Sequence, residues 1–276
     1  MKPDMSSNLK ESKLNNFLLA AGTLLTREIV RFLRQRNRII GALATPLIFW
    51  VLIGSGLGAS FQLPGQLATA GSKINSLQYF FPGTIVMIIL FTAIFSTISI
   101  IEDRREGFLQ GVLVAPVHRG AIMLGKMMGG TVLAVGQAGL FLILSPLLGI
   151  RFSVPDLMYV AMVMVLVALA LTGLGCVIAW KMDSTQGFHA IMNLFLMPMW
   201  FLSGSLFPLD GAPMWLKSVM LLNPLSYGVA SLQQTMFGRI FSASNPLSSR
   251  GFCLGVTALF ALVMFAAATA IASKKD

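Results

Sequence analysis

Charged residues divide this chain into long apolar stretches that alternate with short charged segments. Six stretches, each roughly twenty or more residues long, contain no Asp, Glu, Lys or Arg. They cover residues 39–60, 80–101, 127–150, 157–180, 190–209 and 251–273. A helix of this length spans about 30 Å, the thickness of the hydrocarbon core of a bilayer. Because a helix satisfies its own backbone hydrogen bonds in lipid, the pattern predicts an all-α integral membrane protein with six transmembrane helices.

The composition agrees with a membrane location. Hydrophobic residues make up 56% of the 276 residues, charged residues make up 11%, and the mean hydropathy is +0.80. A water-soluble fold must cover its core with polar residues, and this chain has too few of them. We therefore expect lipid to take the place of water around most of the molecule.

The basic residues lie mostly on one side of the predicted spans. If the segment before residue 39 is cytosolic, the external positions hold only Lys73, Arg151, Lys217, Arg239 and Arg250. The other fifteen of the 20 Lys and Arg residues are then cytosolic, as the positive-inside rule requires. We predict a multi-pass protein of the inner (plasma) membrane with both termini in the cytosol. The pI of about 10.1 then reflects this orientation and contact with anionic lipid, and we expect no nucleic-acid partner.

The segment of residues 1–38, which precedes the six-span domain of residues 39–273, has the pattern of an amphipathic helix. Apolar residues recur at helical spacing, and four arginines follow the spacing i, i+4, i+7 and i+11. These arginines are Arg27, Arg31, Arg34 and Arg38. The pattern predicts an interfacial helix with its guanidinium groups toward lipid phosphates. The alternative is a soluble helix that packs on a partner protein.

The predicted spans carry no group that suits ion coupling, catalysis or cofactor binding. Proton- or ion-coupled carriers place carboxylates, His or Arg at membrane depth, and such residues are absent from the six stretches. Residues 120–127 resemble a P-loop, but Met127 stands where a hydroxyl would bind Mg²⁺. We expect Lys126 to extend toward lipid headgroups, and Cys176 and Cys253 to be packed thiols. No catalytic residue, cofactor or metal site is expected, so the chain alone is not predicted to be an enzyme.

The segment between the second and third spans has the densest charge in the chain. Residues 102–106 read Glu-Asp-Arg-Arg-Glu, and an amphipathic run follows until Pro116. This pattern predicts a short cytosolic helix whose apolar side chains a second protein could accept. A solvated connector fits the composition equally well.

Two motifs resemble those of a known family, and they favour the prediction of a short cytosolic helix over that of a solvated connector. Residues 102–126, EDRREGFLQGVLVAPVHRGAIMLGK, are similar to the signature of type-2 ABC exporter permeases. Residues 193–238, NLFLMPMWFLSGSLFPLDGAPMWLKSVMLLNPLSYGVASLQQTMFG, resemble the fifth span and outward loop of the same family. Both motifs occur in the family's order, and the resemblance covers nearly the whole chain.

The resemblance implies a permease that pairs with a second permease copy, most simply as a homodimer, and docks two copies of a separate ABC ATPase subunit. It assigns the ATPase-coupling residues to Glu102, Arg104, Arg105, Glu106, Gly107, Leu109, Leu113 and Pro116. It assigns an external re-entrant helical hairpin to Phe207, Pro208, Pro213, Trp215, Asn223, Pro224 and Tyr227. Gln110 departs from the family pattern, in which many members carry Glu, so an ion pair from that position to the ATPase is in doubt.

We therefore predict an exporter subunit for a hydrophobic, amphipathic or lipid-linked cargo, with ATP hydrolysis carried by the partner. The motifs resemble permeases for anthracycline-type drugs and nodulation signals more than permeases for surface polysaccharides. One alternative is a membrane enzyme that uses Glu102, Asp103 and Glu106 on a lipid substrate, although Arg104 and Arg105 are expected to neutralise these carboxylates. A secondary carrier is the other alternative.

Overall fold

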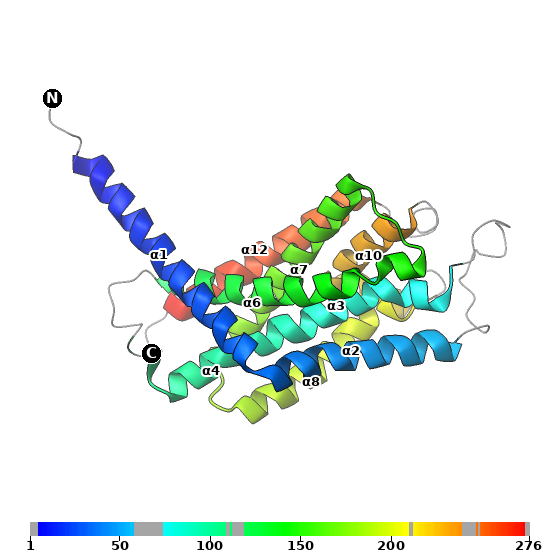
Figure 1. Ribbon diagram of the computed structural model, residues 1–276, viewed down its shortest axis with the longest axis horizontal. Coiled ribbons are helices and arrows are strands. Elements are labelled where there is room, and N and C mark those ends of the chain that lie inside the picture. Colours follow the sequence, from blue (N-terminus) through cyan, green and yellow to red (C-terminus); the bar gives the residue numbers. More distant parts are fainter. Residues whose placement is uncertain are drawn as a thin grey trace.

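The computed structural model describes residues 5–57, 74–108, 111, 119–209, 212–238, 247 and 249–273. Within these ranges the chain is helical and contains no strand, so the predicted all-α class is confirmed. Long helices lie side by side along the long axis of the molecule, as Figure 1 shows.

The helices follow in a simple order along the chain. They are α1 (Met5–Arg34), α2 (Arg36–Leu57), α3 (Ser76–Ser96), α4 (Ile98–Arg105), α6 (Arg119–Leu142), η3 (Ser145–Leu148), α7 (Val154–Ala179), α8 (Thr185–Trp200), η4 (Phe201–Ser205), α9 (Met214–Leu222), α10 (Pro224–Phe237) and α12 (Arg250–Ser273). Of these, η3 is a short 3₁₀ helix and η4 is a turn of π-helix. The segment 109–118 includes only one described residue, Gly111.

Helix α3 forms the centre of the bundle. Every residue from Tyr79 to Ile94 is buried, because α3 is apolar on all sides and packs against α2, α6 and α7. Most of α2 and α12, in contrast, is not buried within the chain. The outer helices therefore present apolar side chains to whatever surrounds the bundle.

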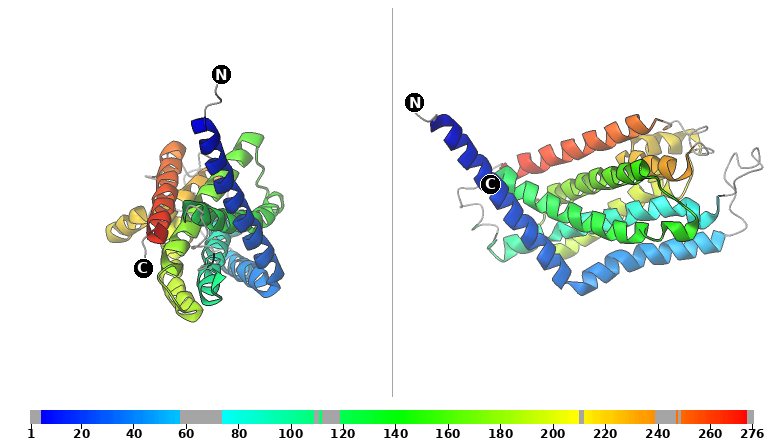
Figure 2. Two further views of the ribbon diagram at one scale, coloured as in Figure 1. Left: turned by 90° about the vertical axis from the view of Figure 1, so that its left-hand side faces the viewer. Right: turned by 45° about the horizontal axis from the view of Figure 1, so that its top comes forward.

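The bundle has two distinct ends. α4 and the end of α12 lie at one of them, which we call the α4 end, and α10 lies near the opposite end (Figure 1). α1 runs obliquely across the α4 end and leaves the bundle toward the N-terminus, as both views of Figure 2 show. It packs mainly against α6, contacts α2 as well, and binds α4 through ionic side chains.

Five helical segments are long and apolar enough to cross a membrane. These are Ile39–Gly56, Ser76–Arg105, Arg119–Leu142, Val154–Ala179 and Arg250–Ser273. They correspond to the first, second, third, fourth and sixth predicted spans. The count of six spanning helices is not established by length and composition.

The fifth predicted span, residues 190–209, is divided in the structure. α8 has 16 residues and ends at Trp200, two residues after Pro198, which lacks a backbone donor. The π-helical turn η4 follows, and Gly204 has a φ of 84° there. The third predicted span, residues 127–150, also differs, because α6 starts earlier, at Arg119, and ends at Leu142.

Two helices occupy the segment in which the sequence suggested an external hairpin. α9 and α10 meet at Asn223, whose Oδ1 accepts a hydrogen bond from the backbone N–H of Leu225 at 3.0 Å. The amide Nδ2 of Asn223 donates to the carbonyl of Met199 at 2.6 Å. α10 packs against α3, α7 and α12 and is largely buried, so α10 belongs to the helical core, whereas α9 is mostly exposed.

Candidate functional site at the α4 end

A buried ionic cluster joins α1, α4 and α6 at the α4 end. The carboxylate of Asp103 on α4 is completely buried. Its Oδ1 accepts hydrogen bonds at 2.6 Å from both Arg27 and Arg31 of α1, and its Oδ2 accepts from Nζ of Lys126 at 2.7 Å. Arg31 also donates to Glu102 at 2.8 Å. Asp103 therefore binds cations from two other helices at once.

Lys126 lies inside this cluster. Only 4% of the residue is exposed, and its Nζ donates to Oε1 of Glu28 at 2.8 Å as well as to Asp103. The prediction that Lys126 extends toward lipid headgroups is wrong, because two carboxylates hold the ammonium group within the protein. A buried charge is tolerated only when it is paired and hydrogen-bonded, and Lys126 meets both conditions.

Close packing of α1 on α6 makes these contacts possible. A Cβ atom at Gly125 would lie 2.7 Å from the carbonyl oxygen of Ala21, and one at Gly129 would lie 2.8 Å from Cβ of Glu28. The two glycines lie one turn apart on one face of α6, and any side chain there would push α1 away. Because these two glycines have no side chains, α1 lies close enough to α6 for Glu28 to bind Lys126.

Two arginines of α1 bind protein carboxylates, whereas the sequence had predicted that they face lipid phosphates. Arg27 and Arg31 point toward α4, and the Arg27 guanidinium also lies 3.8 Å from the centre of the Phe108 ring. The expectation that this arginine stripe faces lipid phosphates is thus wrong for Arg27 and Arg31, because the α4 carboxylates bind them. Arg34 is exposed, and the side chain of Arg38 lies outside the described part of the chain.

The exposed residues of α1 between positions 18 and 33 are uncharged. They are Leu18, Leu19, Gly22, Thr23, Thr26, Val30 and Leu33. The hydroxyls of Thr23 and Thr26 donate to carbonyls of the preceding turn, so they do not require water. Hydrogen bonds to Asp103 raise the pKa of the Arg27 guanidinium, which keeps the inward face of α1 cationic.

A second set of contacts joins α4 to the connection between α7 and α8. Nη1 of Arg104 donates to Oδ1 of Asp183 at 3.2 Å, and its Nη2 donates to the carbonyl of Trp180. Nε of Arg105 donates to the carbonyl of Asp183 at 2.9 Å. Arg104 and Arg105 were expected to neutralise their acidic neighbours on α4, but they bind this connection instead, while the cations for Asp103 come from α1 and α6.

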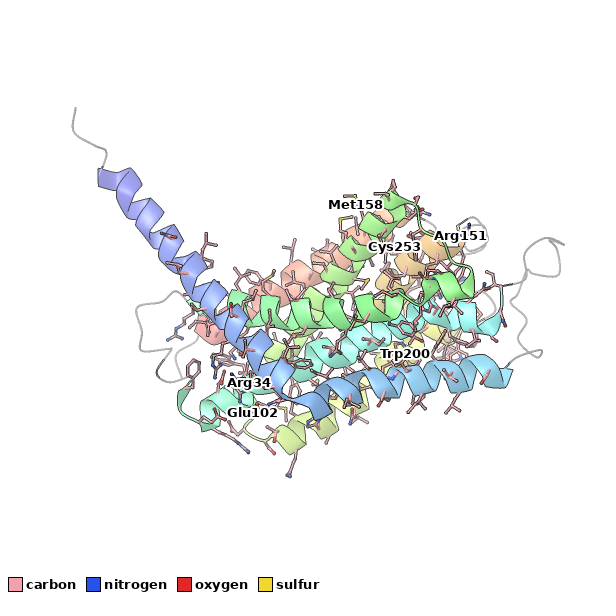
Figure 3. The ribbon with its side chains drawn as sticks, viewed as in Figure 1. Arg34, Glu102, Arg151, Met158, Trp200 and Cys253 are labelled. Carbon is pink, nitrogen blue, oxygen red and sulfur yellow. The ribbon has the colours of Figure 1, made fainter. Side chains whose placement is uncertain are left out.

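The predicted coupling residues lie partly within this region. Glu106 caps the C-terminal end of α4 and lies 3.5 Å from Arg31, and Gly107 follows with a φ of 74°, a backbone conformation that favours glycine. Leu109, Leu113 and Pro116 fall outside the described residues. Figure 3 shows Glu102 and Arg34 at this end of the molecule, and Arg151 and Met158 at the opposite end.

The sequence pattern did not predict the roles of Glu28, Lys126 and Asp183. Glu28 is the only acidic residue in the arginine-rich part of α1, which was a usable signal for an internal ion pair. Lys126 gave no such signal, since a lysine at the end of an apolar stretch is usually interfacial. Its partners are 98 and 23 positions away in the sequence.

The residues assigned to an external hairpin lie on or next to η4, α9 and α10. Phe207 and Trp215 are exposed, and the hydroxyl of Tyr227 donates to the carbonyl of Leu221 at 2.9 Å. Pro213 precedes α9 and Pro224 begins α10. The structure brings Asn223 and Tyr227 together at the junction of α9 and α10. Pro208 is only partly exposed.

These helices, with their apolar outer faces, define an integral membrane protein with several spanning segments. A family model described as ABC-2 type transporter matches residues 20–237. The chain therefore belongs to the ABC-2 type transporter family, and the resemblance drawn from its two motifs is confirmed. It is a permease subunit, and ABC-2 permeases work with an ABC ATPase partner.

Several relatives match over most of the chain. Nodulation protein J of Rhizobium leguminosarum bv. viciae is 26% identical over 240 residues, which cover 86% of this chain and 87% of the relative. A permease named for doxorubicin resistance, DrrC of Mycobacterium tuberculosis H37Rv, is 24% identical and covers 80% of this chain and 79% of its own length. The transport permease ycf38 of Cyanophora paradoxa is 26% identical over 82% of this chain and 80% of its own length.

Proposed function

We propose that this chain is the membrane subunit of an exporter that moves a hydrophobic, amphipathic or lipid-linked cargo out of the cytosol or the inner leaflet. The α4 end is cytosolic in this proposal, and both termini lie in the cytosol beneath an inner (plasma) membrane. The names of two relatives, which refer to doxorubicin resistance and to nodulation, support an export role. The external side then carries Arg151 and the α9–α10 pair.

The proposed driving force comes from a separate ABC ATPase that binds at the α4 end. Two permease copies, most simply identical, pair with two ATPase copies. The contact residues are Glu102, Arg104, Arg105, Glu106 and Gly107, together with Leu109, Leu113 and Pro116, which lie outside the described residues. Residues 1–38 form the cytosolic segment with the interfacial helix, and residues 39–273 form the six-span permease domain.

The contacts of Asp103 carry this proposal. The end of α4 lies immediately before the segment that resembles the family's coupling element. Because Asp103 binds α1 and α6, and Arg104 binds the α7–α8 connection, a displacement of α4 is transmitted to helices on both sides of it. Buried ion pairs resist separation, so ATP-driven movement of the partner would shift these helices together and change the populations of inward- and outward-open states.

The same contacts weigh against the enzyme alternative. A lipid-modifying site would need carboxylates that are free to bind a metal or move a proton, and Asp103 is occupied by three cations. Among the residues that the structure describes, no three His, Cys, Asp or Glu side chains are grouped so that they could hold a metal ion.

Co-purification of this chain with its ABC ATPase partner tests the proposed docking. Glu106→Gln removes an exposed charge, and Gly107→Leu places a side chain where φ is 74°. We expect both variants to retain less ATPase, while Arg151→Gln, at the opposite end of the bundle, retains it fully. Unchanged ATPase binding combined with lost turnover of a membrane lipid would support the enzyme alternative.

A further inference from the structure

The first residue of α6 contacts the last turn of α12. Nη1 of Arg119 donates a hydrogen bond to the carbonyl oxygen of Ala272 at 2.7 Å. Ala272 is almost completely buried and lies one residue before the end of α12. The contact joins residues that are 153 positions apart in the sequence.

The helix dipoles favour the contact of Arg119 with α12. The N-terminal end of a helix carries a partial positive charge, so a cation at the start of α6 is unfavourable for the dipole of α6. The C-terminal end of α12 has the opposite polarity, and its last four carbonyl groups have no partner within the helix. Arg119 donates to one of these carbonyls and complements the α12 dipole.

This contact lies at the C-terminal end of the segment that connects α4 to α6. At the start of the connection, Arg104 and Arg105 bind Asp183 and Trp180 of the α7–α8 connection, and Asp103 binds α1 and α6. At its end, Arg119 binds α12. The two flanks of the proposed coupling segment therefore hold different helices.

α12 is suited to move as a unit. It packs against α7, α10 and α6 on its inner side, and most of its residues are not buried in the chain, including Leu259 and Leu262 on its outer face. Lipid tails offer little resistance to a tilting helix compared with a packed protein interior. A displacement applied at its cytosolic end would therefore change its angle against α7.

We propose that Arg119 is a positioning residue that transmits movement of the coupling segment to α12. This inference rests on the proposed function, because it assumes that an ATPase moves the segment. It adds a second route of transmission: Asp103, Arg104 and Arg105 act on α1, α6 and the α7–α8 connection, and Arg119 acts on the last spanning helix.

Distances between spin labels test this route without a known cargo. In a background in which Cys176 and Cys253 are replaced by alanine, one pair of labels joins Ala270 on α12 to Ile40 on α2, and a reference pair joins Asp183 to Ile40. All three positions are exposed. The complex with its ATPase is measured without nucleotide and after trapping with ATP and vanadate, by double electron–electron resonance in lipid nanodiscs.

We expect trapping to shift the Ala270–Ile40 distance in the native sequence. In Arg119→Gln that shift becomes at least about twofold smaller, because a charge-assisted hydrogen bond is lost, while the Asp183–Ile40 shift is unchanged. Arg119→Lys, which keeps a cation at this position, gives an intermediate shift. Arg151→Gln, an exposed arginine at the opposite end, serves as the matched control and behaves as the native sequence does.

The outcomes separate this inference from the proposed function. An ATPase that does not bind the native chain contradicts the proposed function itself. An ATPase that binds, with an Ala270–Ile40 shift that is absent or equal in the native and Arg119→Gln proteins, contradicts the role of Arg119 alone. If Arg119→Gln does not fold, a bifunctional methanethiosulfonate that joins cysteines at position 119 and at the exposed position 273 replaces the contact. This cross-link must preserve the shift, and loss of the shift would overturn the inference.

Discussion

Asp103 is the residue on which the α4 end depends most. It accepts hydrogen bonds from two arginines and one lysine, and none of its surface is exposed. Taking a carboxylate out of water is costly, and here three cations offset that cost. The functional consequence is that α1 and α6 cannot shift relative to α4 without exposing or separating buried charges.

Replacing Asp103 by Asn should destabilise the folded protein by about 3 kcal/mol, since removing one partner of a buried ion pair leaves the others less well compensated. Lys126 remains paired with Glu28 in this variant, so we expect a loss of stability in the lower part of the range that is usual for broken buried ion pairs. Asp183→Asn is the matched control, because the side chain of Asp183 is 89% exposed and such pairs contribute at most about 1 kcal/mol. Thermal unfolding in a mild detergent measures the loss of stability in both variants. Equal losses would contradict the greater importance assigned to Asp103.

Gly125 is the second decisive residue, because it sets the distance between α1 and α6. A leucine there would meet the backbone of Ala21 and should displace α1, which separates Glu28 from Lys126. We expect faster proteolysis of α1 and weaker ATPase binding. Gly136→Leu on the same helix should have little effect, because a Cβ atom there has no neighbour within 4 Å. An α1 that stays protected in Gly125→Leu would show that the close approach is not required.

At the scale of helices, the arrangement follows from how apolar each one is. α3 is apolar on every side and lies in the centre, whereas α1 carries charges on one face and packs that face inward. The predicted fourth and sixth spans agree with α7 and α12 to within a few residues. Uninterrupted apolar stretches with clear charged or turn residues at both ends leave little freedom in where a helix begins and ends.

The sequence could not predict the boundaries of α8 or the orientation of the α1 arginines. α8 ends within an apolar run, and the cause is local backbone geometry at Pro198 and Gly204. The arginines of α1 would satisfy either lipid phosphates or protein carboxylates, and periodicity cannot distinguish these partners. The choice depends on the approach of α4, a tertiary contact more than 70 positions away in the sequence.

The candidate site was predicted in part. The charged motif of residues 102–107 drew attention to the end of α4, where the buried ionic cluster lies, and its role in ATPase coupling stays a prediction. The motif gave no indication that Asp103 is buried or that Glu28 and Lys126 complete the cluster, because burial depends on the close packing of α1 against Gly125 and Gly129.

At the scale of the whole molecule, the two ends differ in character. The α4 end holds the buried ionic cluster, and the opposite end holds η4, α9 and α10, where polar side chains donate hydrogen bonds to backbone carbonyls. Between them, α2, α8 and α12 expose large apolar side chains such as Leu52, Leu194 and Leu262. These faces suit lipid or a second permease copy.

The proposed orientation can be tested by thiol labelling in whole cells. Ser218 on α9 and Asp183 between α7 and α8 are both exposed and lie on different sides of the proposed membrane. A cysteine at position 218 should react with an impermeant maleimide added outside, and a cysteine at position 183 should react only after the membrane is permeabilised. The reverse pattern would place the α4 end outside and exclude cytosolic docking there.

The central claim is that this chain provides a pathway but no energy source of its own. Its most direct test is transport into sealed proteoliposomes that contain the chain with or without its ABC ATPase, with doxorubicin and a fluorescent phospholipid as probes. We predict that movement of a probe requires both the ATPase and ATP, and that a proton gradient alone produces none. Movement driven by a proton gradient in vesicles that lack the ATPase would contradict the account.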